Sequence, residues 1–415
     1  MRDMSRHRTI RASFALVIGV WLCALGCGGL TLDLGRDEGP GYATPATIAR
    51  EVDAAPGTPT MIASHQYGAY NIVVDDTRVY WTTAGAPPPG RVDLAQESCV
   101  VRSCKKDNCA DTERGVVRSC AKQDCAGTLV TYAVDQTALR RLAVNETHVF
   151  WTVAHSATVP FDAISYSIVA CPLAGCKERP SDVALGLRAL DFGLDESFIY
   201  LRTSEAVVRC PIHGCQGTPT VLATLSHGSS TFAFAVGATH VFWTEGQGSS
   251  NSSETIMMVP KDGSADPHAL AEGGHLVDSL RNDQAKVYWV EGYAAGTVKS
   301  CAMPNCHQTM TTLASSQTYP HLLDVTVDRA SWFVLTSGVR SGPVHLASAA
   351  SMGQLVECPT AACISPLTSL ARDEPNPAAL ASDATHIYWI ALDGVIPQRS
   401  DARPSGTVKR IRRTR

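Results

Sequence analysis

A motif built around Val-Tyr-Trp recurs along this chain and constrains its fold more than any other feature. Its seven copies are VVDDTRVYWT from Val73, AVNETHVFWT from Ala143, GLDESFIYLR from Gly193, AVGATHVFWT from Ala235, RNDQAKVYWV from Arg281, TVDRASWFVL from Thr326 and ASDATHIYWI from Ala381. An Asp or a substitute stands five residues before the aromatic residue, at Asp75, Asn145, Asp195, Gly237, Asp283, Asp328 and Asp383. Six intervals from Asp75 to Asp383 give a period of about 51 residues. A period of this size indicates an array of one repeated structural unit.

Each copy has the pattern of a β-hairpin. Asp and Asn favour the turn because their side chains accept hydrogen bonds from the backbone two residues later. The strand after the turn is apolar at successive positions, which is typical of a strand covered on both faces. A variable connection follows, then a third strand such as GTVKSC at 296–301, a turn flanked by cysteines, and a fourth strand such as TTLA at 311–314. Four antiparallel strands per unit are the composition of a β-propeller blade.

The two ends of the repeat region complement each other. GTPTMIAS at 57–64 nearly copies the fourth strand GTPTVLAT at 217–224, and GTVKRI at 406–411 copies the third strand at 296–301. The last blade therefore lacks a fourth strand that the N-terminal segment can supply, which would remove both free edges. We predict an all-β, seven-bladed β-propeller of four-stranded antiparallel blades over 57–415, closed by the N-terminal strand, with six or eight blades as alternatives. The Trp residues of the repeat are predicted core residues: Trp81, Trp151, Trp243, Trp289, Trp332 and Trp389.

The repeat resembles those of the YWTD and NHL class of β-propellers, and is similar to uncharacterised Cys-rich propeller lipoproteins of bacteria. It departs from a YWTD repeat because no Asp follows the residue after Trp. The third copy has Leu201 in place of Trp, and in the sixth copy Trp332 stands one place early. The resemblance implies a fold and a binding surface, and no activity.

The first 56 residues have the pattern of an export signal and a tether. Four arginines between Arg2 and Arg11 precede an apolar run, Phe14–Leu25, which is typical of a signal peptide over 1–26. The run is shorter than the about 20 residues that span a bilayer. Ala24-Leu25-Gly26-Cys27 resembles a bacterial lipobox, with Ala24 where Leu is usual, so we predict lipidation of Cys27; ordinary signal cleavage is the alternative. Residues 27–56 are then a lipid-anchored flexible tether.

Twelve of the 15 cysteines form six pairs with four residues between the partners. The pairs are Cys104/Cys109, Cys120/Cys125, Cys171/Cys176, Cys210/Cys215, Cys301/Cys306 and Cys358/Cys363. Cysteines that flank a four-residue hairpin loop face each other at disulfide distance, and disulfides persist in an exported protein. In the fourth blade both cysteines are absent together, replaced by Val259 and Ser264, as a crosslink predicts. Zinc sites and haem attachment are alternatives with poorer spacing, and Cys99 has no assigned partner.

Binding residues are predicted with less support than the fold. Four histidines, His65, His227, His275 and His321, precede the first strands of their blades, where they would ring the mouth of the channel. They are either a site for a single metal ion or ordinary solvated loop residues. Tyr67 and Tyr319 lie beside them and could stack on a sugar or a peptide. The basic tail KRIRRTR at 409–415 is interpreted as a solvated strand end, with contact to an anionic surface as the alternative.

Variable connections after the second strands favour a binding role, because such loops on a rigid scaffold commonly carry function. With a net charge of −4, the chain gives no reason to expect a nucleic-acid partner. We expect a monomeric, non-catalytic scaffold of the cell envelope that binds a protein or a glycan, without a cofactor. It would be anchored to the outer membrane only through its lipid, or be periplasmic or extracellular. The alternatives are a metal-dependent propeller lyase or hydrolase, which would hold a stoichiometric metal, and a redox protein, which would have free thiols.

Overall fold

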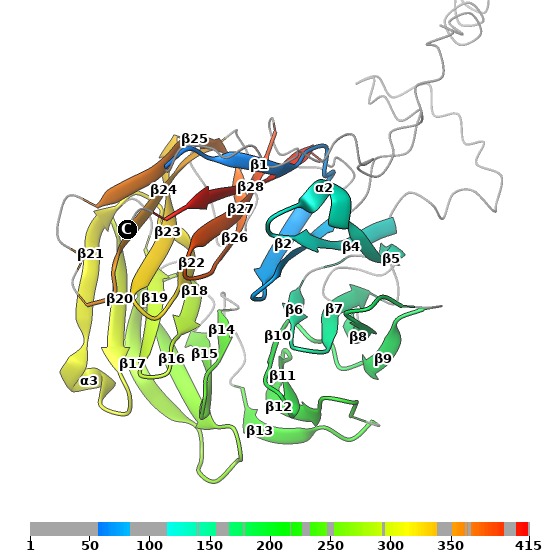
Figure 1. Cartoon of the computed structure of the whole chain (residues 1–415). Coiled ribbons are helices and arrows are strands. Elements are labelled where there is room, and N and C mark those ends of the chain that lie inside the picture. The colour runs from blue at the N-terminus through cyan, green and yellow to red at the C-terminus, as the bar shows by residue number, and fades with distance from the viewer. Residues whose placement is uncertain are drawn as a thin grey trace, which may run out of the picture. The chain divides into compact units, whose positions relative to one another are not determined.

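A computed structural model describes residues 57–83, 114–137, 139, 141–154, 166–176, 179–215, 217–225, 233–246, 253–292, 295–337, 351–361, 363, 367–393 and 404–413. These residues form seven four-stranded antiparallel sheets. Each sheet is a blade, and its first strand lies nearest the centre of the ring (Figure 1). The chain is a seven-bladed β-propeller, as the repeat predicted. None of the helices in the described part is long and apolar enough to cross a membrane.

The blades are numbered in chain order, with strands given from the inner to the outer one. Blade 1 contains β2 (Ala69–Val74), β3 (Arg78–Thr83), β4 (Arg114–Ala121) and β5 (Val130–Thr137). Blade 2 contains β6 (Leu142–Val144), β7 (His148–Ala154), β8 (Tyr166–Pro172) and β9 (Ser181–Ala184). Blade 3 contains β10 (Asp191–Leu194), β11 (Phe198–Arg202), β12 (Ala206–Pro211) and β13 (Thr220–Thr224). Blade 4 contains β14 (Phe234–Val236), β15 (His240–Gly246), β16 (Ser253–Pro260) and β17 (His268–His275).

The remaining blades follow the same order. Blade 5 contains β18 (Val277–Asn282), β19 (Lys286–Glu291), β20 (Gly296–Ala302) and β21 (Thr311–Gln317). Blade 6 contains β22 (His321–Val325), β23 (Arg329–Ser337), β24 (Met352–Pro359) and β25 (Thr368–Pro375). Blade 7 contains β26 (Pro377–Ser382), β27 (His386–Leu392), β28 (Gly406–Arg412) and, from the N-terminal side, β1 (Thr60–Ala63). Two short helices, α2 (Cys125–Thr128) and α3 (Cys306–Thr309), lie between the third and fourth strands of blades 1 and 5.

The ring is closed by the N-terminal strand, as predicted. Strand β1 pairs antiparallel with β28, with Thr60 opposite Arg410 and Ala63 opposite Val408. The backbone N–H of Gln66 donates to the carbonyl of Gly406 at 2.9 Å, which continues the contact beyond β1. Pairing the two terminal segments satisfies backbone groups that an open edge would leave unpaired.

The paired aromatic residues of the repeat are explained by packing between blades. Successive side chains of a strand point to opposite faces, so the two residues contact different neighbours. The residue at the Trp position packs on the preceding blade, and the residue before it packs on the following blade: Tyr388 shares a buried cluster with Trp81, and Tyr80 shares the next cluster with Trp151. Seven such clusters, one between each pair of adjacent blades, form the core of the described structure. All six Trp side chains are fully buried.

The Asp five residues before Tyr makes two kinds of hydrogen bond. Oδ1 of Asp75 accepts from the backbone N–H groups of Thr77 and Arg78, each at 2.7 Å, which closes the turn as predicted. Oδ2 of Asp75 accepts from the hydroxyl of Tyr80 at 2.6 Å. Both kinds recur in the blades that hold Asp195, Asp283 and Asp383. Where Asp is replaced by Asn145 or Gly237, the aromatic residue is Phe, which has no hydroxyl to donate.

The sixth copy is aligned differently from the sequence-based prediction. The turn-closing backbone hydrogen bond that Asp75 makes to Arg78 is made in blade 6 by Thr326 to Arg329, so Thr326, not Asp328, holds the Asp position. Trp332 therefore occupies the ordinary Trp position and is not one place early. The sequence-based alignment chose Asp328 because it also lies in this turn, two residues after Thr326.

Five of the six predicted disulfides are present: Cys120–Cys125, Cys171–Cys176, Cys210–Cys215, Cys301–Cys306 and Cys358–Cys363. Their Cα–Cα distances lie between 4.7 and 5.3 Å, within the usual range for disulfides. Cys99, Cys104 and Cys109 lie outside the described residues, as do Cys27 and all of 1–56. Disulfides of this number indicate an oxidising compartment.

The cysteines do not flank a four-residue hairpin loop, as the spacing had suggested. Ser119 pairs with Val130, so the connection that holds Cys120–Cys125 is ten residues long, and the disulfide closes only its first half. The same length occurs in blades 2, 3, 5 and 6, and blade 4 has nine residues. The first cysteine of each pair is buried in an inter-blade cluster, so the crosslink belongs to the core as well as to the connection.

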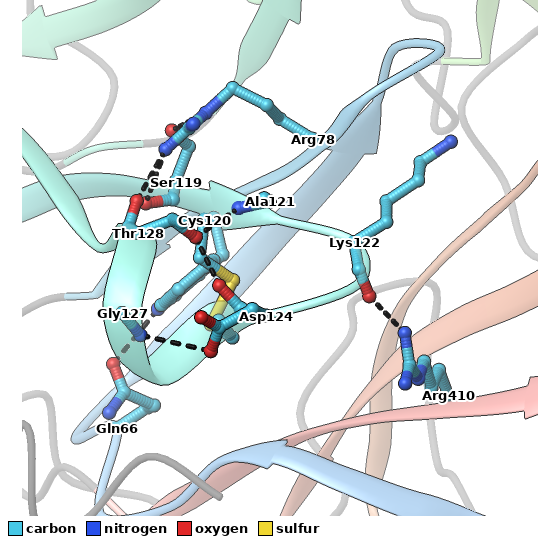
Figure 2. Close-up of a disulfide and its surroundings, with 12 residues drawn as sticks. Gln66, Arg78, Ser119, Cys120, Ala121, Lys122, Asp124, Gly127, Thr128 and Arg410 are labelled. Atoms are coloured by element: carbon cyan, nitrogen blue, oxygen red, sulfur yellow. Dashed lines mark hydrogen bonds between the residues drawn. A yellow bond between two sulfur atoms is a disulfide. The ribbon is translucent and has the colours of Figure 1, made fainter. Parts of the chain in front are cut away.

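The Cys120–Cys125 connection also holds the ring closed (Figure 2). Its Lys122 carbonyl accepts a hydrogen bond from Arg410 of β28. The Lys122 ammonium lies 2.5 Å from the carboxylate of Asp383, which also belongs to blade 7. Its backbone N–H donates to Thr77 at 2.9 Å, which ties the connection to its own blade. One disulfide-bonded loop thus joins the first blade to the last.

The described part of the basic tail, residues 409–413, is folded into the structure, which corrects the interpretation of a solvated strand end. Arg410 and Arg413 are each only 8% exposed. Arg410 pairs with Thr60 and Lys122 at the closure, and Arg413 lies 2.9 Å from the fully buried carboxylate of Glu357.

Stability is expected to fall in acid because of the turn carboxylates. Burial opposes ionisation of Asp383, but hydrogen bonds from Lys122 and from the turn backbone outweigh it and hold its pKa well below the usual value of 3.8. The pKa of Asp75 and that of Asp195 are lowered in the same way. A carboxylate with a lowered folded-state pKa contributes its full stability above the unfolded value and loses it as pH falls through the folded value.

The free energy of unfolding, measured by urea titration, should therefore decline from about pH 4 downward. Asp383→Asn keeps the turn acceptor, as Asn145 does in blade 2, but removes the charge. This variant should be less stable at pH 7 and should show a shallower acid decline. Equal slopes for both chains would contradict the role given to Asp383.

Candidate binding face

The two faces of the propeller differ in how regular their connections are. The disulfide face carries the turns between first and second strands and the disulfide-bonded connections between third and fourth strands. The loop face carries the connections between second and third strands and those that lead from one blade to the next. The connections between second and third strands range from residues 203–205 in blade 3 to residues 84–113 in blade 1, whereas the connections between third and fourth strands on the disulfide face keep nine or ten residues. The length of the connections varies widely only on the loop face.

Backbone conformations of high energy also concentrate at the loop face. Among the described residues, the non-glycine residues with positive φ are His65, Arg188, Leu276, Ser316, Tyr319, Leu322, Asp373 and Asn376. All lie at or next to the passage from the fourth strand of one blade to the first strand of the next. Some of these passages are a single residue long, such as Leu276 and Asn376, so the chain must turn sharply. The described connections of the disulfide face use glycine for positive φ, as at Gly175, Gly214 and Gly263. Strained residues that cluster on one face support a functional role for it.

The predicted histidines do not share one environment. His65 is exposed, and its ring lies 3.1 Å from the hydroxyl of Ser64. His321 is 4% exposed and packs against Phe333, its partner in register. His227 lies outside the described residues, and for His275 only the backbone, in β17, is described. The described residues hold no group of three or more His, Cys, Asp or Glu side chains that could bind a metal ion.

The predicted tyrosines both reach the loop face. Tyr67 lies in the connection between β1 and β2 and is half-buried, and Tyr319 is half-buried between β21 and β22. Tyr70, on the inner strand β2, is 44% exposed. Leu185, in the connection that enters blade 3, is 55% exposed. The described loop face therefore presents aromatic and apolar side chains beside polar ones.

The Trp indoles are each held by a Gln or Glu near the loop face. Trp81 donates from Nε1 to the side-chain oxygen of Gln66 at 2.9 Å, and Trp389 donates to Glu374 at 2.9 Å. In four blades the acceptor stands fifteen residues before Trp, at Gln66, Gln136, Gln317 and Glu374. In blades 4 and 5 that position is glycine, and Glu245 and Glu291, two residues after Trp, accept instead. A buried indole N–H needs such a partner, so these acceptors hold the Trp side chains in place near the loop face.

Charged side chains that sequence reasoning missed converge on the inner strands. Arg141, directly before β6, places Nη2 2.7 Å from Oδ2 of Asp191 on β10. Arg281 on β18 places Nε 3.5 Å from Oδ1 of Asp324 on β22. Ser382, at the end of β26, donates to Oδ2 of Asp324 at 2.5 Å. These residues form two separate groups: Arg141 with Asp191 between blades 2 and 3, and Arg281, Asp324 and Ser382 on the inner strands of blades 5, 6 and 7.

Burial dominates the electrostatics of the aspartate in each group. Burial raises the pKa of Asp191, and it outweighs the opposing charges of Arg141, Arg281 and Arg202. Arg281 belongs to blade 5 and Asp191 to blade 3, so the arginine charge acts on Asp191 across blade 4. Burial likewise raises the pKa of Asp324 against the opposing charge of Arg281. Buried carboxylates with raised pKa values are candidates for functional residues.

The sequence holds a weak signal for these two ion pairs. Arg141 and Asp191 each stand four residues before their turn residue, and Arg281 and Asp324 each stand two residues before theirs, Asp283 and Thr326. Charges at inner-strand positions that are apolar or small in most other copies were visible in the alignment. The misplaced sixth copy concealed that Arg281 and Asp324 stand at equivalent positions.

No protein-family model matches the chain, and no curated protein matches it. Among solved structures, it is similar to the β-propeller domain of the Trilobed protease from Pyrococcus furiosus, at 6% identity and a TM-score of 0.51, over 82% of this chain and 95% of that chain. It is also similar to the WD40 β-propeller domain of Doa1, at 9% identity and a TM-score of 0.47, over 84% and 96% of the two chains. A puromycin-hydrolyzing peptidase of Mycobacterium tuberculosis matches at 12% identity and a TM-score of 0.36, over 61% of this chain. This chain spans about half of that peptidase, 49%.

At such low identity these structures show the fold alone. The β-propeller is established, and the resemblance to YWTD and NHL repeats and to Cys-rich lipoproteins stays a prediction.

Proposed function

We propose that this chain is a non-catalytic interaction scaffold of the cell envelope, whose loop face binds a protein or glycan partner. The observation that carries the proposal is the asymmetry of the two faces. One face repeats the same nine- or ten-residue connection in six blades, while the other varies in length and holds the described non-glycine residues of positive φ. Variable loops on a rigid scaffold are the usual site of recognition.

The proposal includes export and anchoring. The five disulfides support an oxidising compartment. Lipidation at Cys27, followed by the tether to residue 56, would hold the propeller near the outer membrane as a monomer. Acylation of Cys27 can be read from the intact mass of the membrane-extracted protein.

Site-specific photocrosslinking in the intact cell envelope tests the binding role. A photoreactive amino acid at Leu185 places the probe on the loop face, and one at Val327, which is 88% exposed in a first turn of the disulfide face, is the matched control. We expect discrete adducts from position 185 and none from position 327, because the partner contacts only the loop face. Equal adducts from both positions, or adducts from 327 alone, would refute the proposal.

A further inference from the structure

We propose that a protein partner docks on the part of the loop face that leads into blades 6, 7 and 1, with Tyr67, Tyr70 and Tyr319 as its main contacts. Residues 316–322, 372–378 and 64–71 form this surface, which we call the tyrosine arc. The inference deepens the proposed function, on which it rests, because it chooses a protein over a glycan and locates the contact.

The three segments of the tyrosine arc are neighbours in the closed ring. One buried cluster joins blade 6 to blade 7, and another joins blade 7 to blade 1. Tyr319 leads into β22 of blade 6, and Tyr67 and Tyr70 lie at the start of blade 1. The tyrosines therefore lie on either side of the passage into blade 7, on one continuous part of the face.

The backbone of the tyrosine arc is fixed before any partner binds. Of the eight described non-glycine residues with positive φ, six belong to the arc: His65, Ser316, Tyr319, Leu322, Asp373 and Asn376. Such conformations persist only where the surrounding structure determines them. Gln66, 1% exposed, accepts from Trp81, and Asn376, 2% exposed, accepts from the backbone N–H of Ser351 at 2.8 Å. An ordered surface loses little conformational entropy on binding.

Close packing against the preceding blade holds the arc further. Each of its three segments meets a glycine at the start of the third strand of that blade. A Cβ atom would lie 2.5 Å from Pro320 at Gly296, 2.7 Å from Pro377 at Gly353 and 2.8 Å from the Gln66 carbonyl oxygen at Gly406. Only a residue without a Cβ allows so close an approach.

β-Bulges change the direction of side chains where the arc enters the inner strands. The register shifts between Ala69 and Ile72 in β2, between His321 and Asp324 in β22, and between Pro377 and Ala379 in β26. A bulge can re-aim a side chain, and Tyr70, inside the bulge of β2, is 44% exposed. Strand β18 of blade 5 also has a bulge, but the passage into it is the single buried residue Leu276.

The side chains of the arc have the composition of a protein interface. Tyr67 and Tyr319 are half-buried, and Tyr70 is exposed. Tyrosine is enriched in the centres of protein interfaces and among the residues that contribute most to affinity. The exposed charges of the arc are Arg372 and Asp373, which balance each other. The arc therefore suits a partner surface that is apolar at its centre and carries no strong charge.

The extent of the arc favours a protein over a glycan. A sugar ring can be covered by one tyrosine, but the three tyrosines are distributed between the entries of blades 6 and 1. A standard protein interface takes about 800 Å² from each partner. Contacts from three consecutive blades fit an interface of that extent.

Photocrosslinking from within the arc tests the inference. Benzoylphenylalanine replaces Thr318, which is exposed beside Tyr319, and the intact cell envelope is irradiated. We expect one adduct, which mass spectrometry identifies by the peptides of the partner. Tyr70→Ser, in blade 1, should lower the yield of this adduct from blade 6 by at least about tenfold, because removal of a main contact weakens binding by such a factor.

Met61→Ser is the matched control. Met61 is 46% exposed, close to the value for Tyr70, but it lies on the outer strand β1. Both positions are exposed, so both variants should fold, and Met61→Ser should leave the adduct yield unchanged.

Four results would overturn the inference and leave the scaffold standing. They are adducts from position 185 but none from 318, a yield that Tyr70→Ser does not change, an equal loss in Met61→Ser, and an adduct made of glycan in place of peptide. The absence of adducts from both positions would refute the scaffold and the inference together.

Discussion

Deletion of residues 57–63 is expected to lower the free energy of unfolding by about 5 kcal/mol. The deletion removes Ile62 and Ala63, which are 5% and 0% exposed in the cluster between blades 7 and 1. It also removes the backbone ladder to β28. Burial of an isoleucine side chain is worth about 2–5 kcal/mol, and each ladder hydrogen bond adds about 1 kcal/mol. Strand β28 would become a free edge, so the variant should also aggregate.

Urea unfolding followed by the fluorescence of the six buried Trp residues measures this loss. Ile62→Ala is a milder change that can be measured even if the deletion variant does not fold. It should lower the free energy of unfolding by about 2–4 kcal/mol. Met61→Ser is the control, because Met61 lies on the same strand but is 46% exposed. Unchanged stability after the deletion or after Ile62→Ala would show that β1 does not close the ring.

Replacing Cys120 and Cys125 together by Ser is expected to loosen the ring closure specifically. Loss of so short a disulfide loop costs about 2 kcal/mol by chain entropy. The additional effect is local, because Lys122 within this loop holds Arg410 and Asp383 of blade 7. Amide hydrogen exchange of Met61, Lys409 and Arg410 should accelerate by about tenfold as the closure opens more often.

The Cys301–Cys306 pair is the matched control in the same chain. It has the same Cα–Cα distance, 4.7 Å, and is followed by a similar short helix, α3. It lies between blades 4 and 5, away from the termini. Cys301→Ser with Cys306→Ser should therefore destabilise the protein to a similar extent without faster exchange in β1 and β28. Equal acceleration of these amides by both double variants would refute a specific latch in the 120–125 loop.

The alignment of the sixth blade shows where local pattern reading fails. Asp328 looked like the turn residue because Asp favours turns. The structure gives that position to Thr326, since the backbone hydrogen bond to Arg329 sets the register. Trp332 then faces blade 5 like the other Trp residues, beside Tyr288. Packing against a neighbouring blade, which no single copy contains, decides between the two alignments.

The histidines show the limit of spacing arguments. Their spacing placed His65 and His321 ten and seven residues before the assumed turn residue, but with Thr326 in that position His321 stands only five residues before it. His321 is therefore on β22, buried against Phe333, whereas His65 is exposed in the connection before β2. In four blades, by contrast, the acceptor of the Trp indole was readable as a Gln or Glu fifteen residues before Trp.

The sequence alone determined the architecture of this protein. A period of about 51 residues, a turn Asp before paired aromatics, and terminal segments that copy two strands of one blade are local features, and local features specify repeated units. Tertiary structure decided the rest. Arg141 meets Asp191 between blades 2 and 3, and Arg281 meets Asp324 between blades 5 and 6. Each pair forms only because the folded ring brings the inner strands of adjacent blades side by side.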